Sequence, residues 1–290
     1  MTLFETGHSN GSISLKDLIN GIAPQCEDPG LKLDDIIECI SSGGWPLNLG
    51  LDVSKSLQSV RDYLEEIRRV DIRRVNNTRH DPEKVGRFLR SLARNISTSA
   101  TATTLAADSG GSDGPINDDT VREYIDALTR LMIVEDQPAW APHLRSKLRL
   151  RKSPKRHFVD PSLAVAALRA TPETLMKDLN FLGLLFESLV IRDLRVFAQA
   201  NDAQVFHYRD ETNLEVDAIV EAANGQWAAF EIKLGSGRID EGANNLLKFM
   251  NKIDIKKTGK PTTLGVIVGQ GFGYTREDGV SVIPIGSLGP

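Results

Sequence analysis

Apolar and polar residues alternate along two short runs, 214–221 and 227–234, and the segment between them contains Asn224 and Gly225. Alternation with a period of two indicates β-strands, and an Asn-Gly pair between two such runs is typical of a hairpin turn. The pattern therefore predicts a β-hairpin over residues 214–234.

The register of this hairpin depends on the length of its loop. A two-residue Asn-Gly loop would pair Val216 with Lys233 and would mix charged and apolar side chains on both faces. A three-residue loop over 223–225, with a left-handed glycine, pairs Asp217 with Glu231 instead. One face is then uniformly apolar and consists of Leu214, Val216, Ala218, Val220, Ala228, Phe230, Ile232 and Leu234. Because a one-residue slip exchanges the two faces, this pattern selects the longer loop.

The same register gathers Glu215, Asp217, Glu231 and Lys233 at the open end of the other face. Two neighbouring carboxylates repel each other unless a proton or a cation lies between them. Oxygen ligands of this kind suit Mg²⁺ or Mn²⁺, and a lysine beside them can stabilise a phosphate anion or orient a water molecule. The simpler alternative is an amphipathic hairpin whose charged face is solvated.

The rest of the chain alternates helical and extended patterns. Apolar residues at helical spacing predict helices over 33–41, 56–75, 84–95, 103–108, 118–131, 180–199 and 239–253. Asn117 is a candidate N-cap for the helix over 118–131. Strands are predicted over 203–209, 264–268 and 280–285 in addition to the hairpin. We therefore expect an N-terminal helical segment over 1–81, a winged-helix-like domain over 82–170 and an α/β domain with a mixed sheet over 171–290.

A strongly basic stretch, 143–157, contains seven Lys or Arg residues and no acidic residue. The alternating side chains would line one face of a strand and could follow the phosphates of a nucleic acid; the candidate contacts are Arg145, Lys147, Arg149, Arg151 and Lys152. The alternative is an edge strand whose basic residues are solvated or paired with acids. A second basic run on the helix over 56–75 alternates with acidic residues, as solvated helix faces usually do.

Several segments resemble the C-terminal region of prokaryotic AAA-type ATPases, the domain of unknown function 4143. They are Gly43-Gly44-Trp45-Pro46, Ser91-Leu92-Ala93-Arg94-Asn95, Ser153-Pro154-Lys155, Phe158-Val159-Asp160, Leu185-Phe186-Glu187 and His207-Tyr208-Arg209-Asp210. Asp217 followed by Glu231-Ile232-Lys233 also resembles the core of PD-(D/E)XK nucleases. In the AAA-type ATPases, the segment equivalent to residues 3–11 follows the ATPase domain. The resemblance to them therefore implies that the nucleotide-binding half is missing from this chain.

The nuclease resemblance implies roles for individual residues. Glu187, Asp217 and Glu231 would hold a divalent ion, Mg²⁺ or Mn²⁺, and Lys233 would support the attacking water or the scissile phosphate. Glu187 lies on an apolar helical stripe, where a carboxylate needs a partner, so a salt-bridged core acid is the alternative. The chain departs from many such nucleases at Asn244 and Asn245, where a Gln-x-x-x-Tyr motif is common, and this puts activity in doubt.

Composition limits the function further. The 290 residues carry a formal net charge of −4, so nucleic-acid binding would need a local basic surface. Cys26 and Cys39 have no metal-ligand spacing and suggest reduced thiols in a cytoplasmic protein. The sequence has no membrane-spanning apolar stretch, no leader-like start and no nucleotide-binding P-loop, since Gly259-Lys260-Pro261 lacks the required Ser or Thr.

These observations predict a nucleic-acid-associated C-terminal part of a AAA-type ATPase that acts as a metal-dependent DNA nuclease. The first alternative is a catalytically inactive DNA- or protein-binding module that partners a separate ATPase. A third interpretation is a regulatory assembly subunit that binds no nucleic acid.

Overall fold

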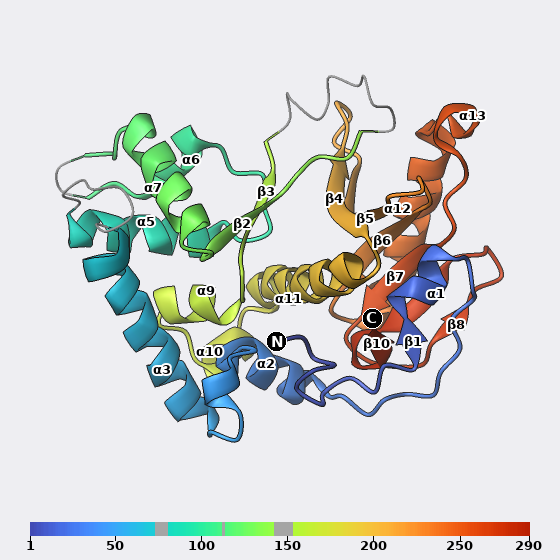
Figure 1. The fold of residues 1–290 in the computed structure, drawn as a ribbon, viewed down its shortest axis with the longest axis horizontal. Helices are drawn as coiled ribbons and strands as arrows, with labels where there is room; N and C mark the ends of the chain where they lie inside the picture. Colours follow the sequence, from blue (N-terminus) through green and yellow to red (C-terminus); the bar gives the residue numbers. More distant parts are fainter. Residues whose placement is uncertain (73–80, 112–113, 142–152) are drawn as a thin grey trace. The chain divides into compact units, whose positions relative to one another are not determined.

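The computed structural model describes residues 1–72, 81–111, 114–141 and 153–290 (Figure 1). The chain forms two compact units, and each unit is assembled from separate stretches of sequence. Unit 1 contains residues 1–36, 137–154 and 189–290, and unit 2 contains residues 37–136 and 155–188. This division does not follow the expected boundaries at 81 and 170, because the N-terminal segment packs with the C-terminal sheet.

Unit 1 is built on a mixed six-stranded sheet with the strand order β4-β5-β6-β7-β9-β8. The strands are β4 (Ala203–Arg209), β5 (Glu215–Ala222), β6 (Trp227–Lys233), β7 (Leu264–Val268), β8 (Tyr274–Thr275) and β9 (Ser281–Pro284). β6, β7 and β9 are parallel, whereas β4–β5, β5–β6 and β8–β9 are antiparallel pairs. This sheet, together with the helices described below, confirms the expected α/β fold class.

The hairpin of β5 and β6 has the expected register. Ala218 pairs with Phe230 and Glu221 with Trp227, and the loop is three residues long because the Ala222 N–H donates to the Gln226 carbonyl. Gly225 is left-handed, with φ +84°. The choice of loop length from the uniformly apolar face is therefore confirmed.

A β-bulge interrupts β5 just beyond this regular pairing. Phe206 pairs with Ile219 and Tyr208 with Val216, so β5 contains one more residue than β4 over this interval. A bulge changes the alternation of side chains. Val216 accordingly packs in one cluster with Ile219 and Trp227, and its assignment to the opposite face was wrong.

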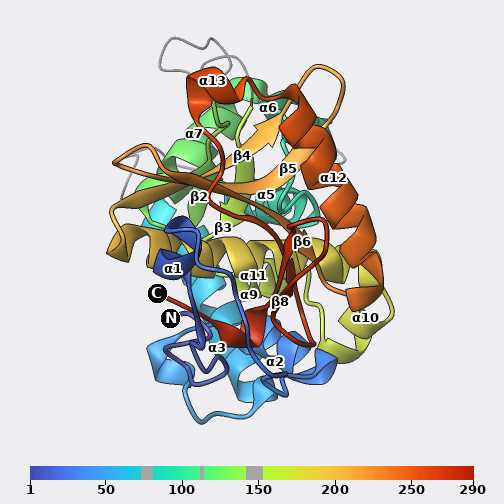
Figure 2. The same cartoon turned by 90° about the vertical axis from the view of Figure 1, so that its right-hand side faces the viewer.

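The charged face of the hairpin is covered rather than solvated. Helix α12 (Ile239–Lys252) runs along the sheet (Figure 2), and its buried Ala243, Leu246 and Phe249 pack with Ile219 and other apolar side chains of the strands. The helix approaches closely because Gly242 has no side chain: a Cβ there would lie 3.1 Å from Val266 Cγ2 and 3.3 Å from Glu231 Cβ. The solvated alternative was therefore wrong.

Short elements at both ends of the chain complete unit 1. Strand β1 (Ile13–Ser14) pairs in parallel with β10 (Leu288–Gly289), which joins residues 275 positions apart, since Ile13 lies opposite Leu288. The remaining elements of this unit are α1 (Leu15–Ile19), η3 (Ser236–Arg238), α13 (Ile255–Thr258) and η4 (Ile285–Ser287). Helices α2 (Leu33–Ser42) and α11 (Leu179–Ala200) and strand β2 (Val134–Gln137) include residues of both units.

Unit 2 is mainly helical. Its elements are η1 (Pro46–Asn48), α3 (Val53–Glu66), η2 (Ile67–Asp71), α5 (Pro82–Arg94), α6 (Ala102–Asp108), α7 (Asp118–Arg130), β3 (Lys155–Phe158), α9 (Ser162–Ala167) and α10 (Pro172–Met176). Asn117 caps α7 as expected, because its side chain accepts the Asp119 N–H. Three helices and the two-stranded β2–β3 sheet follow the expected order, and the specific winged-helix fold stays a prediction.

Two of the quoted sequence motifs meet inside unit 2. The Asp160 carboxylate accepts hydrogen bonds from the Gly44 N–H at 2.9 Å and from the Ser162 N–H at 3.0 Å, and the Trp45 indole donates to the Ser162 hydroxyl. Gly43 is left-handed, and a Cβ there would lie 2.4 Å from Ser162 Oγ. These residues form a buried polar contact that fixes the loop before α3 to the start of α9.

In the described parts of the chain, no helix combines the length and the apolar composition that a membrane span requires.

We expect Gly225→Ala to lower the free energy of unfolding by about 1–2 kcal/mol, because a left-handed backbone costs a residue with a Cβ about that much. Gly235→Ala is the matched control: Gly235 has φ −100° and open space around its Cα. Urea unfolding of the two variants measures the difference. Equal stabilities would contradict the assignment of a strained turn.

Candidate functional site

Asp217 lies where the β5 bulge ends the regular pairing with β6. Its Oδ2 accepts the Ile232 N–H at 2.9 Å, so the side chain takes the place of a backbone acceptor in the ladder. The backbone on either side of the bulge is held by Gln137, whose amide donates to the carbonyls of Asp217 at 2.9 Å and Phe206 at 3.0 Å. These contacts fix the position of the Asp217 carboxylate.

Glu231 is buried beneath α12, with 3% of its surface exposed. Its two carboxylate oxygens have different partners: Asn245 Nδ2 donates to Oε1 at 2.8 Å, and Lys233 Nζ lies 2.8 Å from Oε2. Lys233 Nζ also lies 4.0 Å from Asp217 Oδ2. The lysine therefore joins the two carboxylates, as the hairpin register predicts.

Burial under α12 shifts the ionisation of this cluster. Loss of hydration raises the pKa of Glu231 to about 8, and the nearby charge of Asp217 acts in the same direction, whereas Lys233 and Asn245 act against it. Burial alone would lower the pKa of Lys233, but the carboxylates of Asp217 and Glu231 outweigh burial and raise it. At neutral pH the cluster therefore holds a proton on Glu231 beside a charged lysine.

Asn245 and Gln137 contact the carboxylate cluster, and the sequence analysis did not assign either residue to it. Asn245 lies on α12 and bonds Glu231 as well as the Glu215 carbonyl, at 2.6 Å. Its position next to a missing family motif was a signal, because a polar residue there faces the hairpin. Gln137 precedes Asp217 by eighty residues, so no local pattern could connect the two.

Glu187 belongs to unit 2, where it forms a buried ion pair. Lys155 Nζ lies 2.7 Å from Glu187 Oε1, and the two side chains are 3% and 10% exposed. The alternative of a salt-bridged core acid is thus observed. Among the described residues, no three His, Cys, Asp or Glu side chains form a group that could hold a metal ion. The participation of Glu187 in a metal site stays a prediction.

The predicted nucleic-acid contacts Arg145, Lys147, Arg149, Arg151 and Lys152 lie outside the described residues. The end of the same basic stretch is described and is not available to a phosphate chain. Lys155 is buried against Glu187, and Arg156 donates to the Ala100 carbonyl at 2.7 Å and lies 3.3 Å from Asp136. Both basic residues at this end of the stretch are therefore held by partners within the protein.

Comparison with protein families divides the chain into two regions. Residues 182–288 match the family of a domain of unknown function, DUF4143. Residues 33–174 match a different domain of unknown function, DUF8612. The expected resemblance to DUF4143 is confirmed for residues 182–288, whereas the quoted segments between residues 43 and 160 fall in the DUF8612 match. Searches of curated proteins and of solved structures gave no match.

The raised pKa of Glu231 predicts a pH-dependent stability of the DUF4143 region. The folded protein keeps a proton on Glu231 between about pH 5 and pH 8, whereas the unfolded chain releases it, so the free energy of unfolding falls as pH rises through this window. The slope from one such group is at most about 1.4 kcal/mol per pH unit. Glu231→Gln should flatten this slope in urea unfolding experiments at pH 5, 6.5 and 8.

Glu241→Gln provides the control for this titration. Hydrogen bonds from Arg238 hold the pKa of Glu241 below its usual value, so this residue stays ionised throughout the same window. We expect this variant to keep the slope of the wild-type protein. A Glu231→Gln protein with an unchanged slope would show that Glu231 does not carry the proton.

Proposed function

We propose that the DUF4143 region binds a divalent cation at Asp217 and Glu231 and uses this site to hydrolyse phosphodiester bonds in DNA. One observation carries the proposal: a second carboxylate is buried beside the first at a β-bulge, with a lysine between them. Like charges in a sheet are destabilising, so this pair calls for a compensating positive charge. Mg²⁺ or Mn²⁺ matches these hard oxygen donors.

The protonation of Glu231 supports this interpretation. Burial, and after it the negative charge of Asp217, raise the pKa of Glu231 to about 8, so the site favours a proton or another positive charge on this carboxyl. A divalent cation supplies that charge in place of the proton, so its affinity would rise with pH. The Ile232 N–H already orients the Asp217 carboxylate, so binding of a cation would not first require this side chain to be ordered.

Lys233 would supply a positive charge beside the proposed cation. Its ammonium, held between the two carboxylates, would stabilise negative charge on a bound phosphate and position a water molecule for attack. A bound divalent ion would polarise a phosphoryl oxygen and lower the pKa of a water ligand. The proposal also includes Glu187 as a third carboxylate. The proposed contacts to the DNA backbone are Arg145, Lys147, Arg149, Arg151 and Lys152.

The relation to an ATPase also belongs to this proposal. The resemblance to the C-terminal region of AAA-type ATPases supports a role beside an ATPase domain or subunit, and the chain would contribute the nucleic-acid site rather than nucleotide hydrolysis.

A catalytically inactive module is the second candidate, and particular contacts favour it. Asn245 and Lys233 occupy both oxygens of Glu231, and Lys155 holds Glu187 in a buried pair. A site closed by its own side chains would act as a structural cluster. The chain would then bind DNA or a protein partner without cleaving it.

Incubation with plasmid, linear and single-stranded DNA, with and without Mn²⁺, separates the two candidates. The first candidate predicts Mn²⁺-dependent cleavage that Asp217→Asn abolishes, because the variant loses a charged ligand while keeping the shape of the side chain. Asp254→Asn is the matched control, since Asp254 caps α13 and lies outside the carboxylate cluster. Calorimetric titration with Mn²⁺ should show binding to the control and greatly weakened binding to Asp217→Asn.

Cleavage that persists in Asp217→Asn would contradict the nuclease proposal and would point to a contaminating enzyme. Salt-dependent DNA binding without cleavage, equal in wild type and Asp217→Asn, would favour the inactive module. If the protein does not change the electrophoretic mobility of any of these DNAs at low salt, both nucleic-acid candidates are rejected.

A further inference from the structure

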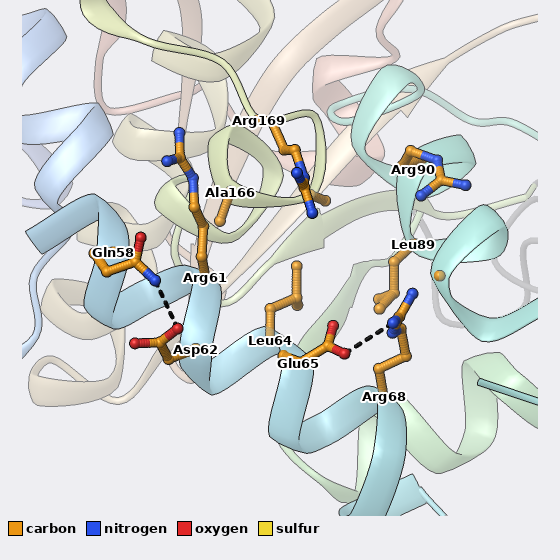
Figure 3. A pocket seen from close by; sticks show the side chains of 12 residues that line it. Gln58, Arg61, Asp62, Leu64, Glu65, Arg68, Leu89, Arg90, Ala166 and Arg169 are labelled. Atoms are coloured by element: carbon orange, nitrogen blue, oxygen red, sulfur yellow. Dashed lines mark hydrogen bonds and ion pairs between the residues drawn. The ribbon is translucent and has the colours of Figure 1, made fainter. Parts of the chain in front are cut away.

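A second candidate site lies in unit 2, in the region that matches DUF8612. Helices α3 and α5 and the segment that follows α9 surround a cavity of about 380 Å³ (Figure 3). Small-molecule sites in proteins commonly have volumes of about 300–1,000 Å³. This cavity differs from most of them because its lining is rich in arginine.

Four arginines line the cavity: Arg61, Arg68, Arg90 and Arg169. They come from three separate parts of the fold. In Figure 3 the guanidinium groups of Arg68 and Arg169 point toward the space between the helices, and those of Arg61 and Arg90 lie at its sides. Asp62 and Glu65 are the acidic residues of the lining, so four positive charges face two negative ones and leave a net formal charge of two positive.

The hydrogen-bonding capacity of these arginines is only partly used. The Nε atoms of Arg61 and Arg68 are buried and have no hydrogen-bond partner among the described residues. Arg68 does pair with Glu65 at 2.8 Å and Glu83 at 3.4 Å, and Arg61 donates to the Ala170 carbonyl at 3.3 Å. A buried donor without a partner costs free energy, which a bound acceptor would recover.

The two remaining arginines of the lining, Arg90 and Arg169, are exposed to solvent. Arg90 and Arg169 form no ion pair within the described ranges of the chain. Arg169 also has a left-handed backbone, with φ +53°, although it is not a glycine. This conformation ends α9, because the Ala170 N–H donates to the Val165 carbonyl at 3.0 Å, as in common helix C-caps. Here the backbone conformation accompanies a side chain that points into the cavity.

We propose that this pocket binds a small phosphorylated molecule through its phosphomonoester group. The planar guanidinium fork matches phosphate oxygens in geometry, and a phosphomonoester carries a charge of about −1.5 to −2 at pH 7, which balances the lining. A carboxylate would neutralise only half of that charge. The site is independent of the Asp217 cluster, so neither proposal depends on the other.

Calorimetry at low ionic strength tests the proposal, with inorganic phosphate, adenosine monophosphate, adenosine and a 5′-hydroxyl oligonucleotide as probes. We expect phosphate and the monophosphate to bind and adenosine not to bind. Arg90→Gln and Arg169→Gln should each weaken binding by about tenfold or more, because each removes a charge-assisted hydrogen bond. Arg122→Gln is the matched control, since Arg122 lies on α7, is 65% exposed and is absent from the lining.

Glu65→Gln provides a test in the opposite direction. Glu65 competes with the ligand for Arg68, so its neutralisation should strengthen phosphate binding, whereas a purely structural role would give no gain. Failure of phosphate and the monophosphate to bind, or equal affinities in Arg90→Gln, Arg169→Gln and Arg122→Gln, would overturn the proposal. Binding of the oligonucleotide alone, lost in Arg90→Gln and Arg169→Gln, would also overturn it in favour of a nucleic-acid contact.

Discussion

The burial of Glu231 beside Asp217 is the constraint on which the arrangement of unit 1 depends. An acid covered by a helix must be neutralised by a proton or a cation, or its charge must be stabilised by hydrogen bonds. The neighbouring residues meet this requirement in different ways. Gly242 lets α12 approach Glu231, and Asn245 and Lys233 bond its two oxygens. On the other strand, the bulge and Gln137 direct the Asp217 carboxylate toward the same place.

The sequence predicted the hairpin in detail because register is a binary choice. A one-residue slip would have moved Val220 and Phe230 to the charged face, and only one loop length avoids this. The bulge was not predictable in the same way. It depends on pairing with β4 and on Gln137, and it changed the face of Val216 without changing the local pattern of residues.

The environment of the carboxylates could not be predicted from the sequence, because it depends on how distant parts of the chain fold together. An alternating strand pattern shows that charged residues share a face, but it does not show what covers that face. Here α12 covers it, which turns a surface pair into a buried one with a raised pKa. The partner of Glu187 was equally hidden, because Lys155 belongs to a stretch that resembles a basic surface and is nevertheless buried.

The two family matches correspond to different parts of the fold. The DUF4143 match contains all six strands of the mixed sheet, from β4 to β9, and reaches residue 288 in β10. The strand that pairs with β10 is β1, which lies before residue 33, where the DUF8612 match begins. A protein made from residues 182–288 alone would therefore lack β1 and the Gln137 support of Asp217.

The ionisation of Glu231 tests the account most directly. Nuclear magnetic resonance of the carboxyl carbon of Glu231 measures its pKa in the full chain, first without divalent cations and then with saturating Mg²⁺. The account predicts an apparent pKa near 8 without the cation and a decrease of two units or more, to about 6 or below, when Mg²⁺ replaces the proton. A Glu231 that titrates near its ordinary value of about 4.3, with no response to Mg²⁺, would contradict both the buried-acid interpretation and the proposed cation site.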